Sequence, residues 1–343
     1  MKDFRLRQVL GLLAKTTPFL VFRFLIYFGI TLGYFLMTGV GAGLGYFVGS
    51  IGDDPGAASV WGGIFGFGAA SAVMYFLREY LLYMVKAGHI AVLVELMDGK
   101  DIPGGRGQID YAQQAVRERF AQSSILFALD QIIKGVLKAF NRTFFTIAVL
   151  LPIPGAGAIV KFINTIINLS LTYVDEVILA YNLRTRSENP WKSSQEALVL
   201  YAQNYKSFLK NAFFLAFVIW GLTLVVFLVI LAPVAGLVSL LPGTAGPLTL
   251  LVALVFAWGV KQAVIEPIAM TSLMQVFFKV TEGQVPNAEW EARLDQVTGK
   301  FSSLRDKAKT WGASGQPAPE SALPRREYGP GPDPGNRETS AGP

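Results

Sequence analysis

The amino-acid sequence predicts an all-α integral membrane protein with two transmembrane helical hairpins, four spans in all, a central broken apolar hairpin and cytoplasmic amphipathic helices. Hydrophobic residues make up 52% of the chain and charged residues only 16%, whereas soluble domains contain roughly a quarter charged residues. Two stretches, 24–77 and 211–260, contain no lysine or arginine. Each is longer than the about 20 residues that one spanning helix needs, so each is predicted to cross the membrane twice.

The distribution of basic residues predicts the orientation. Every lysine and arginine lies before, between or after the two hairpins, or near the inner end of the last span, and neither hairpin tip carries one. Basic residues are enriched in cytoplasmic loops. We therefore expect a multi-pass protein of the cell (plasma or inner) membrane with both termini in the cytoplasm.

The first 23 residues are predicted to form a cytoplasmic N-terminal segment, and residues 24–86 the first transmembrane hairpin. Its two apolar blocks, 24–50 and 59–77, are separated by the turn "IGDDPGAA". Aspartate, proline and glycine favour turns over helix. The hairpin is therefore predicted to have an acidic tip.

Glycines recur at intervals of four on both helices of this hairpin. Small residues at this spacing let two helix backbones approach closely. We expect packing within the hairpin, with homo-oligomerisation through the same glycines and a glycine-lined pore as alternatives. The glycines concerned are Gly29, Gly33, Gly41, Gly45, Gly49, Gly62 and Gly66.

Residues 87–142 are predicted to form cytoplasmic amphipathic helices, including one long helix over 108–140. Residues 143–183 form an apolar hairpin that is broken by "PIPGAG" at 152–157. Its first arm, "TFFTIAVLL", rises about 14 Å as a helix, roughly half of the hydrocarbon core. We expect a re-entrant or wedge-like hairpin that enters from the cytoplasmic side; two full spans, six in all, are the alternative.

A polar stripe follows the second arm of this broken hairpin. Its members are three or four residues apart, which places them on one face of a helix. Such a stripe can line a polar cavity, bond to other helices or face water at the interface. The candidate polar path consists of Lys161, Asn164, Asn168, Thr172 and Asp175, together with Lys261 and Glu266 of the last span. Asp175 and Glu176 are expected to be a solvated pair near the cytoplasmic surface.

Residues 184–210 are predicted to contain an amphipathic helix. This helix is expected to open after Pro190, where Ser193 and Glu196 have capping-box spacing. Residues 211–278 are predicted to form the second transmembrane hairpin. Its spans, 211–232 and 248–268, are joined by an uncharged connection that begins at Pro233.

Two features of the last span leave alternatives open. Lys261 is predicted to extend its long side chain to the cytoplasmic interface, or else to form an ion pair or part of a translocation path. Pro267 is expected to loosen the helix just after Glu266.

Residues 279–311 are predicted to form a cytoplasmic helix with an apolar seam that runs from Trp290 to Trp311. This helix is expected to dock on the inner leaflet or on the protein's own cytoplasmic layer. The remaining residues, 312–343, are rich in proline and glycine and are predicted to be disordered.

Several kinds of chemistry are excluded by composition. The chain has no cysteine and one histidine, which excludes thiol nucleophiles and metal sites that need two imidazoles. No phosphate-binding glycine motif is present. We therefore expect no cofactor, no enzymatic activity and no nucleic-acid partner. The expected partners are the lipid bilayer and either a second copy or another membrane protein.

Three segments of the second half resemble the C-terminal half of the choline transporter-like family. They are "VLKAFNR", "SSQEALVLYAQN" and "VIEPIAMTSLMQVFF". The resemblance implies movement of choline-like cations or lipid precursors, and no binding residue is carried over from it. The chain departs from the family by inserting the broken hairpin and by lacking many N-terminal spans and a cysteine-rich loop.

Two functions fit these features. The first is a transporter or channel for small polar or cationic solutes or lipid, which would use the broken hairpin and the polar residues. The second is a membrane scaffold or assembly factor, which would use the glycines and the amphipathic helices to organise partners or bilayer shape.

Overall fold

The computed structural model describes residues 2–52, 54–102, 106–119, 123–145, 157–239 and 246–311. Every regular element among these residues is a helix. The helices are α1 (Leu6–Lys15), α2 (Thr17–Gly49), α3 (Pro55–Met97), α4 (Arg106–Arg119), α5 (Ser123–Phe145), α6 (Gly157–Thr172), α7 (Val174–Thr185), α8 (Pro190–Gln203), α9 (Tyr205–Val238), α10 (Gly246–Val260), the π-helical turn η2 (Lys261–Ile265), α11 (Glu266–Val280), α12 (Ala288–Val297) and α13 (Gly299–Thr310).

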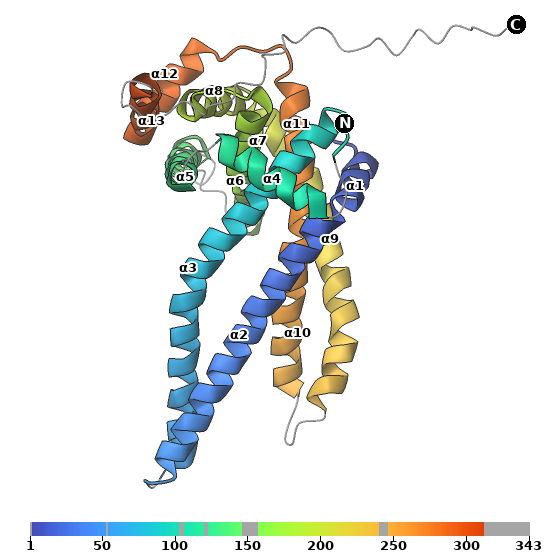
Figure 1. Cartoon of the computed structure of the whole chain (residues 1–343), viewed down its shortest axis with the longest axis vertical. Coiled ribbons are helices and arrows are strands. Elements are labelled where there is room, and N and C mark those ends of the chain that lie inside the picture. The colour runs from blue at the N-terminus through green and yellow to red at the C-terminus, as the bar shows by residue number, and fades with distance from the viewer. Residues whose placement is uncertain are drawn as a thin grey trace, which may run out of the picture.

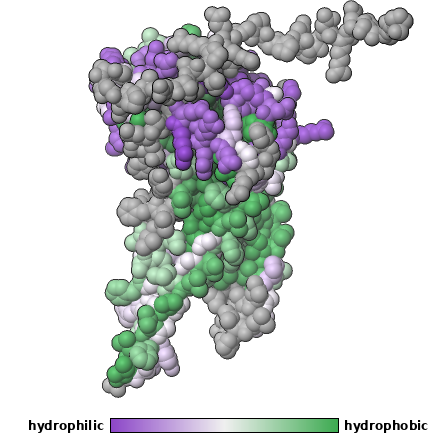
Figure 2. Space-filling view, in the orientation of Figure 1, coloured by the Kyte–Doolittle hydropathy of each residue, from purple (hydrophilic) through white to green (hydrophobic). Residues whose placement is uncertain are grey.

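The molecule has two parts, which we call the stem and the head (Figure 1). The stem consists of α2, α9, α10 and the first half of α3, and the head contains the remaining helices. Figure 2 shows that hydrophilic residues gather on the head and hydrophobic residues on the stem. Three stretches of the described residues are long and apolar enough to cross a membrane, namely Thr17–Gly49, Tyr205–Gly236 and Val252–Val280. The chain therefore has the helices of a membrane protein.

The first hairpin consists of α2 and α3, which have 33 and 43 residues. Asp54 caps α3, because its carboxylate accepts a hydrogen bond from the Ala57 amide at 2.9 Å. Pro55 occupies the first position of the helix, where its missing N–H costs nothing. The two predicted apolar blocks are both helical, and α3 continues past the predicted end at Leu77 to Met97, deep in the head.

Four of the glycines lie where α2 and α3 come closest together. A Cβ atom on Gly41 would overlap the Gly62 carbonyl oxygen, and one on Gly66 would overlap that of Met37. Gly45 has the same relation to Ala58. The other three predicted glycines differ. A Cβ atom on Gly29 would have no neighbour within 4 Å, one on Gly33 would meet the Met74 side chain, and one on Gly49 would meet Pro55 at the hairpin turn.

The second hairpin differs from its predicted boundaries. Helix α9 starts at Tyr205 and continues through Pro233 to Val238, so the prediction that Pro233 begins the connection is wrong. A proline removes one N–H and strains a helix, but neighbouring helices compensate for this loss in membrane proteins. The returning helix is α10, which passes through the π-helical turn η2 into α11.

Three expectations for the head are corrected. The long helix expected over 108–140 is two helices, α4 and α5. The cap of α8 is Asn189, whose side chain accepts from the Lys192 amide at 3.0 Å, while Ser193 bonds Asn182 instead of closing a capping box. The single helix expected over 279–311 is α12 and α13, separated at Thr298, whose side chain caps α13.

The broken hairpin is described only in part. Its first arm after Phe145 and its turn up to Ala156 lie outside the described residues, so the re-entrant path stays a prediction. The second arm is divided into α6 and α7 by a break at Tyr173. The predicted disordered tail, 312–343, also lies outside the described residues.

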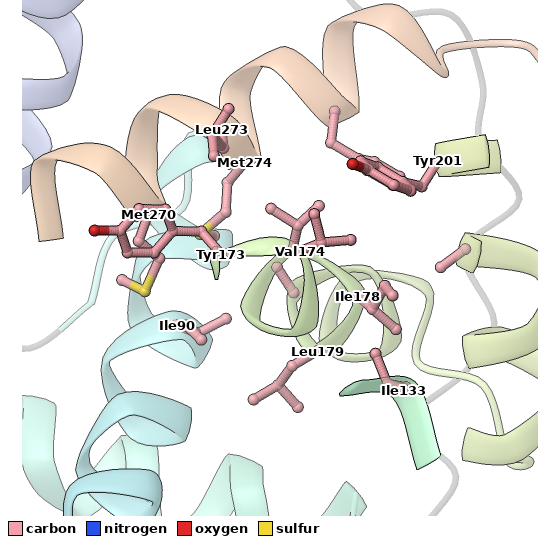
Figure 3. Close-up of a cluster of buried hydrophobic side chains, with 14 of the residues drawn as sticks. Ile90, Ile133, Tyr173, Val174, Ile178, Leu179, Tyr201, Met270, Leu273 and Met274 are labelled. Atoms are coloured by element: carbon pink, nitrogen blue, oxygen red, sulfur yellow. The ribbon is translucent and has the colours of Figure 1, made fainter. Parts of the chain in front are cut away.

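Helix α7 forms the centre of the head. Figure 3 shows Val174, Ile178 and Leu179 of this helix surrounded by side chains from α3, α5, α8 and α11. The apolar seam of α12 and α13 packs on the same core, where Leu294, Phe301 and Leu304 are buried. Of the two docking sites expected for this segment, the inner leaflet and the protein itself, the structure shows the second: α12 and α13 pack on the head.

Candidate functional site

A charged cavity of about 200 Å³ lies where the stem meets the head. Its walls come from α2, α3, α5, α7 and the η2–α11 junction, so both hairpins and the head contribute. The lining residues are Tyr27, Leu82, Tyr83, Lys86, Ile90, Asp130, Lys134, Asp175, Glu176, Leu179, Gln262 and Glu266. Six of these twelve carry an acidic or basic side chain, which is unusual for a cavity beside apolar helices.

Local helix geometry places these side chains. Asp130 and Lys134 are four residues apart on α5, as are Gln262 and Glu266 on the last span, so each pair faces one way. The break at Tyr173 makes Asp175 and Glu176 part of the first turn of α7. Carboxylates in that turn interact favourably with the helix dipole.

The π-helical turn positions Glu266. In the π-helical turn η2 the Glu266 N–H donates to the Lys261 carbonyl, five residues earlier. In the same register residue 267 would donate to the Gln262 carbonyl, but Pro267 has no N–H. The Gln262 carbonyl accepts a hydrogen bond at 3.0 Å from Arg23 Nη2. π-Helical turns occur frequently at functional sites.

A chain of buried ion pairs runs through the cavity wall. Arg23 Nη2 donates to Glu266 Oε2 at 2.7 Å, and the Arg23 side chain is 0% exposed. Lys86 Nζ donates to Glu266 Oε1 at 3.0 Å and to Glu176 Oε1 at 3.1 Å. Glu266 therefore pairs with two cations, and these pairs join α2, α3 and α11. The Lys86–Glu176 pair adds α7 to the network.

A second group of charges lies on the opposite wall. Lys134 Nζ is 2.8 Å from Asp130 Oδ2 and 3.6 Å from Asp175 Oδ2. Only the shorter of these distances is within hydrogen-bond range. Lys134 therefore forms a hydrogen-bonded ion pair with Asp130 and a longer, weaker ion pair with Asp175.

Burial and neighbouring charges move the pKa values of the carboxyl groups in opposite directions. Burial, with the adjacent negative charge of Glu176, raises the pKa of Asp175 well above its ordinary value. Burial acts in the same direction on Glu176, but the charge of the Lys86 ammonium and hydrogen bonds to the carboxylate together outweigh it and lower the pKa of Glu176. Burial also raises the pKa of Asp130, against the opposing effect of Lys134.

An apolar groove of about 300 Å³ adjoins the charged cavity. It lies between α2, α9 and α10 in the stem, and its lining is almost entirely aliphatic and aromatic. Tyr27 lines both spaces. The lining residues are Phe24, Tyr27, Phe28, Thr31, Ile230, Pro233, Val234, Val252, Phe256, Gly259 and Val260.

The structure brings together two residues of the predicted polar path. Asp175 and Glu266 both line the charged cavity. Lys261 lies on η2, half-buried and outside the cavity lining. Asn168 and Thr172 are exposed on α6, where the Thr172 hydroxyl donates to the Asn168 carbonyl at 2.7 Å. The side chains of Lys161 and Asn164 lie outside the described ones.

The expectation of a solvated acidic pair is wrong. Glu176 is 7% exposed and bonded to Lys86, and the Asp175 side chain is 11% exposed. The reason is that α7 runs through the centre of the head, so its first turn faces the cavity and not the surrounding water.

Sequence reasoning missed four charged members of the cluster, namely Arg23, Lys86, Asp130 and Lys134. Arg23 was assigned to the cytoplasmic N-terminal segment, although it lies within α2 and is buried. One signal was present in the sequence: Arg23 and Tyr27 are one helical turn apart, and so are Asp130 and Lys134.

Within the described part of the chain, no group of three His, Cys, Asp or Glu side chains is arranged to hold a metal ion. Comparisons with known protein families, curated proteins and solved structures give no match to the chain.

Proposed function

We propose that the chain is a non-enzymatic multi-pass transport protein of the cell membrane, and that it moves a lipid-like amphiphile with a cationic headgroup. One observation carries this proposal: Tyr27 lines both a charged cavity and an apolar groove. A polar solute alone would need no apolar groove, and a hydrocarbon alone would need no ions. The pair of spaces suits a molecule that has both parts.

The charges of the cavity select the sign of the headgroup. Three cations, Arg23, Lys86 and Lys134, face four carboxylates. The cluster therefore carries one surplus negative charge when every group is ionised. A primary ammonium group would balance this charge and donate hydrogen bonds to the carboxylate oxygens.

The transport proposal includes a topology of four spans, with both termini in the cytoplasm. Helix α1 and helices α12 and α13 all lie in the head (Figure 1), which requires an even number of crossings. Three stretches are apolar enough to cross, and the first half of α3, paired with α2 along its length, supplies the fourth. The head is then the cytoplasmic side.

Single cysteines test this topology, because the chain contains no cysteine of its own. We expect Ser50→Cys and Ser239→Cys, at the two hairpin ends, to react with a membrane-impermeant maleimide in intact cells. Gln8→Cys and Thr310→Cys, both exposed in the head, should react only after the membrane is opened. Labelling of Ser50→Cys and Gln8→Cys from the same side would contradict the topology.

Lipid translocation tests the function directly. In liposomes that contain a lipid whose headgroup has a primary amine and a net positive charge, such as lysyl-phosphatidylglycerol, a membrane-impermeant amine reagent labels only the outer leaflet. We expect the reconstituted protein to make the inner-leaflet ammonium headgroups reactive as well. Glu176→Gln should slow this process, because it removes a carboxylate of the cavity. Glu289→Gln, an exposed change on α12, is the matched control.

The same translocation assay also distinguishes the transport function from the scaffold function. Labelling no greater than in empty liposomes, from protein that keeps its native elution profile, would contradict translocation. It would favour the scaffold. In that function some of the large apolar side chains that the first hairpin exposes would contact a second copy or another membrane protein in place of lipid. These side chains include Leu44, Phe47, Val48, Ile51, Trp61 and Phe65.

A further inference from the structure

We infer that Asp175 is a proton-binding site of the charged cavity, which holds one proton while the cavity contains no cation and releases it when a monovalent cation enters. The inference deepens the proposed function by naming what moves in exchange for the cation. The release of the proton when a cation enters rests on the proposed function. The proton site itself rests on the charges of the cavity alone.

The described charges beside Asp130 and Asp175 do not cancel. Arg23 and Lys86 are engaged by Glu266 and Glu176, which leaves Lys134 as the only cation near Asp130 and Asp175 among the described side chains. One ammonium cannot neutralise two carboxylates. An uncompensated buried carboxylate is costly, and such a group takes up a proton instead.

Asp130 and Asp175 differ in how well their charges are compensated. Asp130 has two donors, because Lys134 lies at 2.8 Å and the Gln131 side-chain amide donates to Oδ2 at 3.4 Å. Among the described side chains, the one cation paired with Asp175 is Lys134, at 3.6 Å. Asp175 is therefore the carboxylate whose charge is least compensated.

An acceptor beside Asp175 is unsatisfied. Glu176 Oε2 is buried and accepts no hydrogen bond from the described residues, whereas Oε1 accepts from Lys86. Asp175 is the neighbour of Glu176 in the first turn of α7, and both carboxyl groups line the same cavity. Two carboxyl groups form a hydrogen bond only when one carries a proton. A proton on Asp175 would supply the donor that Glu176 lacks.

The described ionisable groups around the cavity supply Asp175 with no further cation. The Tyr83 hydroxyl donates to the Leu126 carbonyl at 3.0 Å. These groups are Tyr27 of α2, Tyr83 and Lys86 of α3, Asp130 and Lys134 of α5, Glu176 of α7, Glu266 of α11, and, behind Glu266, Arg23 of α2. The raised pKa of Asp175 agrees with this arrangement.

The exchange step conserves charge. A monovalent cation that enters the cavity binds the Asp175 carboxylate as its O–H bond breaks, and the proton leaves to water. The cluster is neutral before and after this step. A carrier that exchanges a proton for its cation couples transport to a proton gradient.

Infrared spectroscopy of the full-length protein in nanodiscs tests the site. We expect the carbonyl band of a protonated carboxyl group at neutral pH, and we expect isotopically labelled aspartate to shift it. Asp175→Asn should abolish the band, while Asp295→Asn, on α12 and paired with Arg305 at 2.7 Å, should leave it unchanged. Absence of the band in the unaltered protein, or its persistence in Asp175→Asn, would overturn the inference.

Stability gives a second readout that needs no substitution. A carboxyl group with a raised folded-state pKa contributes stability below its unfolded pKa, and this contribution is lost as pH rises through the folded value. The thermal midpoint of the unaltered protein should therefore fall as pH rises through that value, and Asp175→Asn should lose this dependence. A midpoint with the same pH profile in both proteins would count against the site.

The cation half uses dodecylammonium as the probe, with dodecanol as the neutral control of equal chain length. We expect dodecylammonium to weaken the carboxyl band at constant pH and dodecanol to leave it unchanged. If the band exists but neither probe changes it, exchange is contradicted while the proton site stands. If translocation fails but the band responds, the proposed function falls and the proton site remains.

Discussion

Replacing Glu266 by glutamine is expected to destabilise the folded protein more than any other single change in the charged cluster. The glutamine keeps the shape of the side chain but removes the charge that balances both Arg23 and Lys86. Breaking a buried ion pair by removing one partner costs about 3–5 kcal/mol, because the remaining charge stays buried. Here two cations lose a partner, and Arg23 is fully buried.

The prediction is tested by ranking the thermal stabilities of three variants. Arg23→Met should cost less than Glu266→Gln, since Glu266 would keep Lys86 as a partner. Glu289→Gln should change little, because the Glu289–Arg293 pair is exposed and surface pairs contribute little. The measurement is the midpoint of thermal unfolding in one detergent. A Glu266→Gln midpoint no lower than that of Arg23→Met would show that Glu266 does not hold the network together.

Replacing Gly62 by alanine is expected to disrupt the first hairpin. The new Cβ atom would overlap the Gly41 carbonyl oxygen on α2 and come within 2.9 Å of Gly45 Cα. Backbone atoms cannot rotate away as a flexible side chain can, so α2 and α3 must separate. Overpacking of this kind costs about 1–3 kcal/mol or more, against a gain in helix propensity of about 1 kcal/mol.

Gly68→Ala, on the same helix, is the matched control. A Cβ atom there has no neighbour within 4 Å, so only the gain in helix propensity remains and the thermal midpoint should be unchanged or higher. The two substitutions add the same methyl group and are expected to act in opposite directions. Equal shifts at the two positions would show that close backbone contact does not stabilise this hairpin.

The sequence was sufficient to predict the features that depend on local pattern. Long uncharged stretches predicted helices apolar enough to cross a membrane, and the described residues contain three such helices. The apolar seam from Trp290 to Trp311 was visible in its spacing, and its central members are buried. Both signals depend only on which residues share a helix face.

The charged cavity could not be predicted in this way. Lys86 and Glu266 are 180 residues apart, and Arg23 and Glu266 are 243 apart, so no local pattern connects them. Asp175 and Glu176 followed an apolar arm, which suggested a surface position. Only the path of α7 through the head decides that this turn is buried.

Local turn and cap signals were also overruled by packing. Pro233 resembled the start of a connection, yet α9 continues through it inside the apolar stem. Ser193 had the spacing of a capping box, but its hydroxyl bonds the buried Asn182 side chain. In both cases the contacts of the folded chain outweigh a preference that acts over a few residues.

The π-helical turn at Lys261–Ile265 has a consequence for the rotational phase of the last helix. A π-helical turn amounts to one extra residue in an α-helix, and one residue corresponds to about 100° of rotation. The side of α10 that faces the stem and the side of α11 that enters the head core, at Leu273 and Phe277, are therefore set independently. Removing one residue from this turn would restore a regular helix but rotate one half against the other, so that Glu266 and the apolar face of α11 could not both keep their partners.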